Sequence, residues 1–470
     1  MNIASSYIRH PHISMHYVAS LLLILFFINR SYAQNFAGIR TSNKVGFVKQ
    51  LVNPAFKADM PDKWSVHIFS FQGNLAGSNA SLNWSSLPRL TTETLKEKWV
   101  SSSKNTFVFA SAEMLGPAVM WRTPKIGVLS FSTRSRLYVN GYNLDGRIIA
   151  DIDDHGVEMV SHPYTVGPKL FMRANNTMLN ELVLGWADKI WEKGAHQLRG
   201  GVNVKYISGV SNASLAIEEF NGTVRYNKQL PDSYLTDASG VLSTRTAGKS
   251  LNHIGLFDLF KMRKGGLGAD IGFSYEFHSR EEKKTYLLKF ALALNDIGAV
   301  AFQPDSKYSI NYDVSIPANK QFYFHEGLSG SEFNKAASVF DKYPAYFKET
   351  AVATTSYRIG LPTTLNWSVD YNLDKGFFVN FEAQENLRKI GSPAAIYTYS
   401  FYALTPRYEN DRVGVFLPLS YNPLSKMQAG LALRFGPVFI GSGSLFTALG
   451  KSKQLDGFFG VSFSKKATKP

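Results

Sequence analysis

The chain has 470 residues, no cysteine, 14% aromatic residues and a formal net charge of +15. The absence of cysteine excludes a small disulfide-stapled secreted fold, thiol chemistry and thiolate metal sites. Because the basic residues form no arginine-rich run, the charge favours attraction to anionic lipopolysaccharide or an anionic solute, and we expect no nucleic-acid partner.

The first predicted element is a secretory signal peptide over residues 1–33. Residues 18–28 form an apolar core of eleven residues, followed by Ser31 and Ala33, the small residues that signal peptidase requires. A membrane helix needs about 20 apolar residues, so this core is too short to span as one. The signal predicts a protein that is exported from the cytoplasm.

We expect cleavage between Ala33 and Gln34. Cleavage removes two arginines and no acidic residue, which lowers the net charge from +15 to +13. Two alternatives stay open: Met15 is the true start, or the leader remains uncleaved as an N-terminal anchor.

Residues 34–62 have weak periodicity and contain the run Asn53, Pro54, Ala55 and Phe56. Proline at 54 fixes its own φ and restricts the preceding asparagine to extended geometry. The asparagine side chain can also bond to nearby backbone, as in a turn. The run predicts a rigid bend; the alternative is a plain turn that leads into the first strand.

Residues 63–464 show the period of β-strands. In 267–278 apolar residues alternate with small, polar or charged ones, so the two sets fall on opposite faces. With a secretory signal and many aromatic residues, this pattern predicts an all-β fold: a transmembrane antiparallel up-and-down barrel of about 14 strands, with 12 or 16 as alternatives. The predicted strands are 64–73, 105–114, 125–140, 179–192, 196–208, 266–279, 284–295, 362–373, 376–384, 397–408, 411–419, 427–435, 437–446 and 457–464.

Other segments predict additional elements in the connections. Short helices are expected over 91–101 and 331–342, as loop elements or lumen plugs. Further strands or loop hairpins are expected within 78–85, 157–173, 211–226 and 306–316. Residues 465–470 form a polar, basic tail beyond Phe463, although barrels often end on an aromatic residue.

The sequence carries no G-x-S-x-G nucleophile elbow, no phosphate-binding G-x-x-x-x-G-K-[ST] loop and no H-E-x-x-H metal motif. We therefore predict no catalytic residues, no cofactor and no metal site. A Ser–His pair inside the barrel, as in a phospholipase, is the enzymatic alternative. Residues 151–154 contain three aspartates, which form a solvated acidic turn or bind calcium.

Charged residues on spanning strands must point into the barrel, because facing lipid costs roughly 2–4 kcal/mol for Arg or Lys. Two interpretations stay open: an ion-pair network that fills the barrel, or a constriction that binds solute. The lumen residues predicted on this basis are Arg134, Arg136, Lys205, Asp270, Glu276, Asp370, Glu382 and Arg434.

Several segments resemble a family of uncharacterised Bacteroidota outer-membrane proteins, distantly similar to the FadL-type fatty-acid channels and to the type IX secretion protein PorV. The likeness covers most of residues 34–464. The segments are Asn53-Pro54-Ala55, Asn180-Glu181-Leu182, 200–206, 268–273, 295–298 and 405–409.

The resemblance implies a barrel with an N-terminal plug over residues 34–62. Asn53, Pro54, Ala55 and Phe56 would be its hatch residues. It also implies a channel for passive uptake of small hydrophobic or amphipathic solutes, integral to the outer membrane and in contact with its lipid and lipopolysaccharide. The alternatives are a PorV-like barrel that docks secretion or surface proteins, with 317–361 as a candidate outer loop, or a structural barrel without transport.

Overall fold

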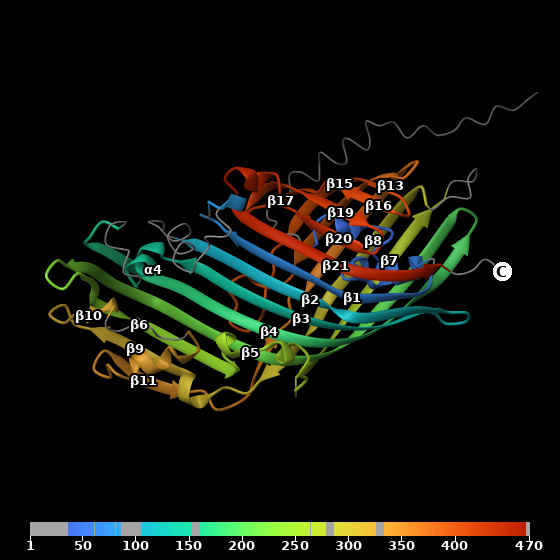
Figure 1. The fold of residues 1–470 in the computed structure, drawn as a ribbon. Helices are drawn as coiled ribbons and strands as arrows, with labels where there is room; N and C mark the ends of the chain where they lie inside the picture. The colour runs from blue at the N-terminus through green and yellow to red at the C-terminus, as the bar shows by residue number, and fades with distance from the viewer. Residues whose placement is uncertain are drawn as a thin grey trace, which may run out of the picture.

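The computed structural model describes residues 36–60, 62–79, 81–85, 105–152, 160–263, 265–278, 286–325 and 333–466. These residues form a closed antiparallel β-barrel of 14 spanning strands (Figure 1). The barrel closes where its first strand pairs with its last, with Val66 opposite Phe463. The predicted fold class and strand number are confirmed.

All fourteen predicted spanning strands are present, and two of them are interrupted. In order around the barrel they are β1 (Asp62–Gly77), β2 (Thr106–Thr123), β3 (Gly127–Leu144), β4 (Tyr164–Lys193), β5 (His196–Asn227), β7 (Gly266–Phe277), β8 (Leu288–Phe302), β13 (Thr364–Asp374), β14 (Phe377–Asn386), β15 (Phe401–Glu409), β16 (Val413–Phe416) continued by β17 (Leu419–Asn422), β18 (Lys426–Ala429) continued by β19 (Leu431–Phe435), β20 (Val438–Ser442) and β21 (Gln454–Lys466).

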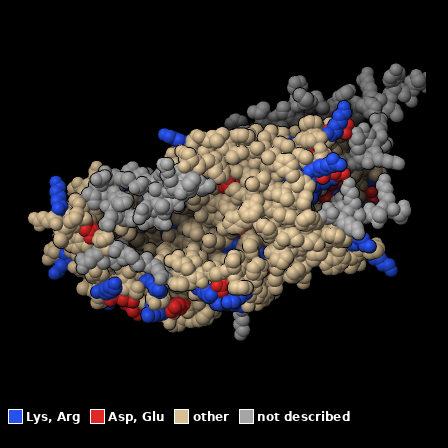
Figure 2. All heavy atoms as spheres, in the orientation of Figure 1, with Lys and Arg blue, Asp and Glu red and all other residues tan. Residues whose placement is uncertain are grey.

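Side chains alternate between the lumen and the outer face of the barrel. On β7 the inward Asp270 and Glu276 are buried, whereas the outward Leu267 and Phe273 are 68% and 46% exposed. Figure 2 shows a broad uncharged zone over the barrel, with most charged residues toward its two ends. This is the apolar band that an outer-membrane barrel presents to lipid. Among the described residues, no helix has the length and apolar character needed to cross a membrane.

The two ends of the barrel differ in the length of their connections. Short turns join β2 to β3, β4 to β5 and β13 to β14 at one end, where β1 begins and β21 ends. At the other end the connections are long, such as 387–400. In bacterial barrels the short turns are periplasmic and the long loops extracellular, and we assign the two ends accordingly.

A second sheet extends beyond the barrel at the long-loop end. Strands β4 and β5 continue past the barrel wall, and the second half of β5 pairs with β6 (Asp232–Gly248). Beyond β6 lie β9 (Ile310–Ile316), β10 (Phe322–Tyr323) and the edge strand β11 (Phe347–Val352); β12 (Tyr357–Gly360) returns to pair with β8. A cluster of 20 buried apolar residues forms the core of this extension. The extension is drawn on the left of Figure 1.

The helices of the described residues are short and lie in the N-terminal segment or in the connections between strands. Three belong to the N-terminal segment: η1 (Ile39–Thr41), α2 (Gly46–Gln50) and η2 (Pro54–Asp59). The others are α4 (Gly146–Ile152), η4 (Leu251–His253), η5 (Leu256–Leu259), η6 (Ser306–Tyr308), η7 (Phe333–Lys335), α7 (Ala337–Phe340) and η8 (Thr447–Leu449).

Several strand predictions differ from the structure for physical reasons. The predicted strand 411–419 is interrupted at Pro418, which has no N–H to give to a ladder. The predicted strand 397–408 begins only at Phe401, because Tyr397 and Tyr399 turn into the barrel and are buried. Within 78–85 the described residues form only an isolated bridge at Leu82.

The remaining additional segments are accounted for as follows. Residues 211–226 are the far part of β5, those of 157–173 from Tyr164 onward belong to β4, and 306–316 holds η6 and β9. The predicted helix 331–342 appears as η7 and α7, whereas the predicted helix 91–101 lies outside the described residues.

The acidic turn predicted at 151–154 was wrong at Asp151. This residue lies in α4 and is buried, and its carboxylate accepts hydrogen bonds from Tyr164 (2.6 Å) and Ser233 (2.8 Å) and contacts His162 (3.0 Å). The side chain is therefore an internal link of the extension. Asp153 and Asp154 lie outside the described residues, so the calcium alternative stays a prediction.

Candidate gating site in the barrel lumen

Residues 36–60, here called the hatch, lie inside the barrel wall at the short-turn end (Figure 1). Asn53 fixes the start of η2: its backbone is extended, and its Oδ1 accepts the N–H of Ala55 at 2.8 Å. Its Nδ2 donates to the carbonyls of Phe273 (2.9 Å) and Leu292 (3.1 Å) on β7 and β8. One buried asparagine therefore caps the short helix and attaches it to two strands of the wall.

Three glycines of the wall let this segment approach the strands closely. A Cβ at Gly201 would lie 2.5 Å from the carbonyl group of Pro54. At Gly272 it would lie 2.2 Å from Asn53 Oδ1, and at Gly185 2.5 Å from the ammonium of Lys57. Gly201 and Gly272 are directly opposite each other on β5 and β7. We call Gly185, Gly201 and Gly272 the glycine platform.

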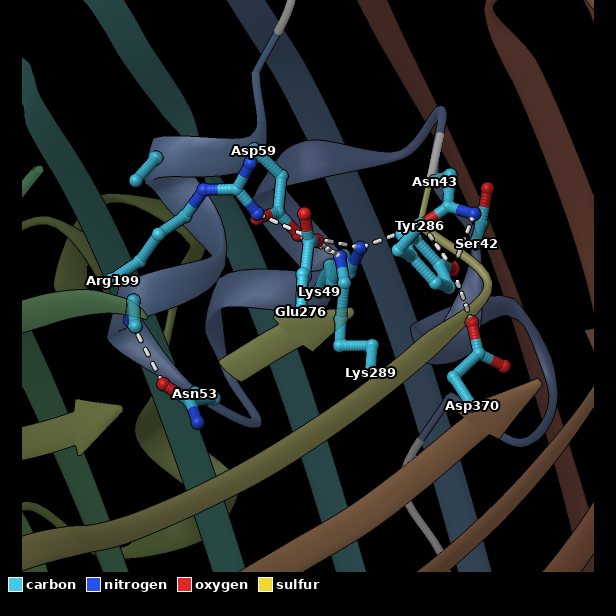
Figure 3. Close-up of polar contacts among 12 residues, drawn as sticks. Ser42, Asn43, Lys49, Asn53, Asp59, Arg199, Glu276, Tyr286, Lys289 and Asp370 are labelled. Atoms are coloured by element: carbon cyan, nitrogen blue, oxygen red, sulfur yellow. Dashed lines mark hydrogen bonds and ion pairs between the residues drawn. The ribbon is translucent and has the colours of Figure 1, made fainter. Parts of the chain in front are cut away.

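An ion cluster joins the end of the hatch to the wall (Figure 3). Asp59 bonds to Lys49 of the hatch (3.0 Å) and to two wall residues, Arg199 (2.7 Å) and Lys289 (2.5 Å). The predicted residue Glu276 completes the cluster, at 2.6 Å from Arg199 and 2.5 Å from Lys289. All five side chains are nearly or fully buried, so each charge depends on the others for compensation.

Two lysines of the hatch are held in unfavourable surroundings for a charge. Burial lowers the pKa of Lys49 to about 8, assisted by repulsion from Lys289 and opposed by Asp59. Burial lowers the pKa of Lys57 to about 7, opposed by Asp270. The Lys57 ammonium bonds to the side chain of Asn203 and has no carboxylate at salt-bridge distance among the described residues. Burial therefore disfavours the charged form of both lysines.

Phe56 lies beneath the ion cluster and is 7% exposed. It packs with Val52 of the hatch and Ala291 of β8. The ammonium groups of Lys49 and Lys289 lie 4.7 Å and 5.5 Å from the centre of its ring, within cation–π range.

A second ion-pair network crosses the lumen above the hatch. Arg136 bonds to Asp296 at 2.7 Å and to Glu181, while Lys205 bonds to Asp296 and Asp270, each at 2.6 Å. Arg134 joins this layer through Glu181 at 3.8 Å and also pairs with Glu113 at 2.7 Å. Four of the predicted lumen residues, Arg134, Arg136, Lys205 and Asp270, are brought together here.

The other predicted lumen residues have separate partners. Asp370 bonds to Arg407 at 2.6 Å and to the hydroxyl of Tyr286, and Glu382 bonds to Arg40 of the hatch at 3.1 Å. Arg434 lies apart from these networks, because its guanidinium donates to backbone carbonyls of the turns at the short-turn rim, including Gly436 at 3.0 Å.

The space left in the lumen is divided by the hatch. A cavity of about 60 Å³ lies between the hatch and the second network, lined among others by Arg40, Val48 and Asp296. A larger vestibule of about 820 Å³ lies at the short-turn end, lined by hatch residues such as Lys44 and Asp59. Drug-sized ligands occupy sites of about 300–1,000 Å³, so the inner cavity is too small for one.

The long-loop end of the lumen is filled by apolar and aromatic side chains. Ile396, Tyr397 and Tyr399 of segment 387–400 are each 1% exposed and pack against Phe109 and Phe302 of the wall. The lumen is therefore apolar and aromatic at the long-loop end, and ionic in the middle and at the short-turn end.

Residues 54–443 match a family of unknown function, DUF5723. The chain belongs to this family. A search of curated proteins finds no significant match.

Among solved structures, this DUF5723 chain is similar to the toluene transporter TbuX of Ralstonia pickettii, with 8% identity, a TM-score of 0.40 and coverage of 90% of this chain and 94% of that one. It is also similar to the toluene transporter TodX of Pseudomonas putida, with 10% identity, a TM-score of 0.34 and coverage of 94% and 99%. A FadL homologue of Pseudomonas aeruginosa gives 8% identity, a TM-score of 0.23 and coverage of 93% and 100%.

Sequence reasoning missed several residues of this DUF5723 site. Arg199, Lys289 and Arg407 lie on spanning strands, and their inward positions follow the same period of two that identified Glu276. Asp296 breaks this period, because it lies at a β-bulge with a φ of 55° and points inward directly after the inward Asn295. The glycine platform and the pairing of Asp59 with the wall have no sequence signal of this kind, because they depend on which strands the hatch meets.

Proposed function

We propose that this DUF5723 barrel is a gated outer-membrane channel for the passive uptake of small hydrophobic or amphipathic solutes, with the hatch as its gate. The observation that carries the proposal is the seat of the hatch on the glycine platform. The segment is attached there by the capping asparagine and the ion cluster, and Lys57 and Arg40 add side-chain bonds to Asn203 and Glu382 of the wall. Such a segment can leave the wall without breaking any strand pairing.

The chemistry of the lumen favours an apolar solute. The solute would enter at the long-loop end, through the aromatic cluster around Tyr397 and Tyr399. An apolar molecule can take the place of an aromatic side chain there and keep the same kind of contact with its neighbours. The inner cavity of about 60 Å³ is too small to hold such a molecule. The hatch must therefore shift before a solute reaches the vestibule at the short-turn end.

Uptake of a small apolar fluorophore by whole cells tests this proposal. Cells that produce the full chain should take up phenylnaphthylamine faster than cells that lack it, while the uptake of a polar cephalosporin dye stays unchanged. No increase for the apolar probe, or an equal increase for both probes, would contradict selective apolar transport.

The extension supports a second function, that of a PorV-like docking barrel for secretion or surface proteins. It has its own core of 20 buried apolar residues and an edge strand, β11, paired on one side only in the described structure. Gentle crosslinking followed by purification separates the two functions: a stoichiometric protein partner favours docking, and bound apolar molecules without a partner favour transport.

The proposal includes secretion with cleavage before Gln34 and residence in outer-membrane lipid and lipopolysaccharide. N-terminal sequencing of the protein isolated from membranes should begin at Gln34. A sequence that begins at Met1 or Met15 would support an uncleaved leader.

A further inference from the structure

A loop between β6 and β7, residues 249–263, lies on the outer face of the barrel. In Figure 1 its yellow-green trace crosses strands β4 and β5. The wall residues that bond to this loop point away from the lumen, which places the loop outside the barrel. Ser135 stands between Arg134 and Arg136, which point inward to the ion network, so Ser135 points outward. We call residues 249–263 the collar loop.

The same alternation places three further wall residues outside. Asn180 precedes the inward Glu181, and Tyr206 follows the inward Lys205. Ser208 follows Ile207, which packs in the aromatic cluster of the lumen. Three strands thus carry polar atoms on the face that should meet lipid.

These four outward side chains bond to the backbone of the collar loop. Ser135 donates to the carbonyl of Leu259 (2.7 Å), and Asn180 donates to those of Asp258 (2.7 Å) and Lys261 (3.0 Å). The backbone of Arg263 is bonded twice: its N–H donates to Ser208 (2.8 Å), and its carbonyl accepts from Tyr206 (2.8 Å). Irregular backbone in lipid requires such internal partners, because no water is available there.

Along the membrane normal, the hydrogen bonds between the wall and the collar loop lie within the apolar band. Asn180 is six residues along β4 from Trp186, which belongs with Trp64 and Trp121 to an exposed tryptophan girdle near the short turns. Six residues extend about 20 Å along a strand, or about 15 Å along the membrane normal at the tilt usual for barrels. Since the band is about 25 Å tall, the collar loop lies in its outer half.

The collar loop presents three large apolar side chains, beside the exposed polar residues Asn252, His253, Lys261 and Arg263. Leu256, Phe257 and Phe260 are 78%, 84% and 52% exposed. The acid of the described loop, Asp258, is itself neutralised by Lys249 at 2.8 Å. The Lys261 side chain is 58% exposed, its ammonium lies 3.4 Å from Asp258, and its long apolar stem can lie along the lipid.

We propose that the collar loop is embedded in the outer leaflet, with Leu256, Phe257 and Phe260 among the lipid acyl chains. The occupant of this surface is membrane lipid. The loop lies at the fork where β5 exchanges β7 for β6 as its partner, between Ile207 and Ser211. It therefore seals the outer side of the fork at which the extension leaves the barrel.

The absence of native cysteine permits a direct test with single nitroxide labels in proteoliposomes of phosphatidylethanolamine and phosphatidylglycerol. The reporters are Phe257→Cys and Leu256→Cys. Val204→Cys is the lipid-facing reference, and Leu230→Cys, in the turn that joins β5 to β6, is the aqueous one. These two references are matched, at 58% and 59% exposure.

Relaxation by oxygen and by a water-soluble nickel chelate gives the depth of each label. We expect both reporters to resemble Val204→Cys, with high oxygen and low nickel accessibility. Reporters that resemble Leu230→Cys would overturn the proposal. In a second measurement, Asn180→Ala should increase the mobility of the label at 257, and unchanged mobility would contradict the role of the wall hydrogen bonds.

Discussion

A substitution at Gly201 tests whether close contact with the wall holds the hatch in place, because the added side chain would meet the hatch without disturbing the strand pairing. Valine suits a strand, but its Cβ would meet the Pro54 carbonyl group at 2.5 Å. Overpacking of this kind costs about 1–3 kcal/mol. We expect Gly201→Val to shift the hatch off the platform while the barrel assembles, which limited proteolysis within residues 36–60 would detect.

Gly457→Val on β21 is the matched control, because a Cβ there meets nothing within 4 Å. Heat-modifiable gel migration verifies that both barrels form. Equal protease resistance of the hatch in the two variants would show that the glycine platform does not hold it.

Lys57 predicts how the hatch responds to pH. Burial lowers its pKa to about 7 from the ordinary lysine value of 10.5, so the released hatch binds more protons than the seated one between these values. Seating therefore strengthens as pH rises above about 7 and weakens as pH falls toward it. Lys49, with a pKa of about 8, acts in the same direction at higher pH.

Proteolysis of the hatch should accordingly slow from about pH 6 to about pH 8. Lys57→Met keeps the length of the side chain without its charge and should flatten this dependence. The same slope in the variant and the wild type would refute the role of Lys57.

At the scale of the element, the capping of η2 decides how firmly the hatch is held. Asn53→Ala with Pro54→Ala removes the cap, two bonds to the wall and the fixed φ of the bend. Loss of a cap alone costs about 1 kcal/mol. We expect the double variant to increase sensitivity to bulky antibiotics and to proteolysis of residues 36–60. If both stay unchanged, residues 53–56 form only a turn before β1.

The elements themselves were predictable to different degrees. The fourteen spanning strands followed from the period of two, since each needs one apolar face toward lipid and one polar face toward the lumen. The interruption at Pro418 was visible in the sequence, whereas the inward turn of Tyr397 and Tyr399 was not. Long strands such as β5 were predicted only in their barrel part, because their continuation depends on a new partner, β6.

Residues of the candidate site that lie on spanning strands could be predicted from the alternation of inward and outward side chains. Asp270 and Glu276 could be placed in the lumen from β7 alone, but their partners could not. The pairing of Asp59 with Arg199 and Lys289 joins residues 140 and 230 positions apart. Such contacts depend on the path of the hatch inside the closed barrel.

At the scale of the whole molecule, the barrel is a wall with three layers inside it. The hatch and its ion cluster lie at the short-turn end, the second ion network crosses the middle, and aromatic side chains fill the long-loop end. The side chains of the wall just fill the interior of an eight-stranded barrel, and barrels of 16–18 strands leave an aqueous channel. A barrel of 14 strands is close to the second group, so closing it requires additional layers inside the lumen. In the proposed channel, a solute would pass only if these layers opened in turn, beginning or ending with the hatch.

A reversible lock on the hatch tests the central claim most directly. Asn53 Cγ lies 2.8 Å from the position of a Cβ at Gly272, so Asn53→Cys with Gly272→Cys places two thiols at bonding reach in a cysteine-free chain. Phenylnaphthylamine uptake by cells that produce this variant would be measured before and after reduction, with the two single-cysteine variants as controls. A hatch that gates the channel predicts low uptake in the oxidised state and a marked rise on reduction, because the reduced variant lacks the Asn53 cap. Equal uptake in the disulfide-bonded and reduced states would contradict the account.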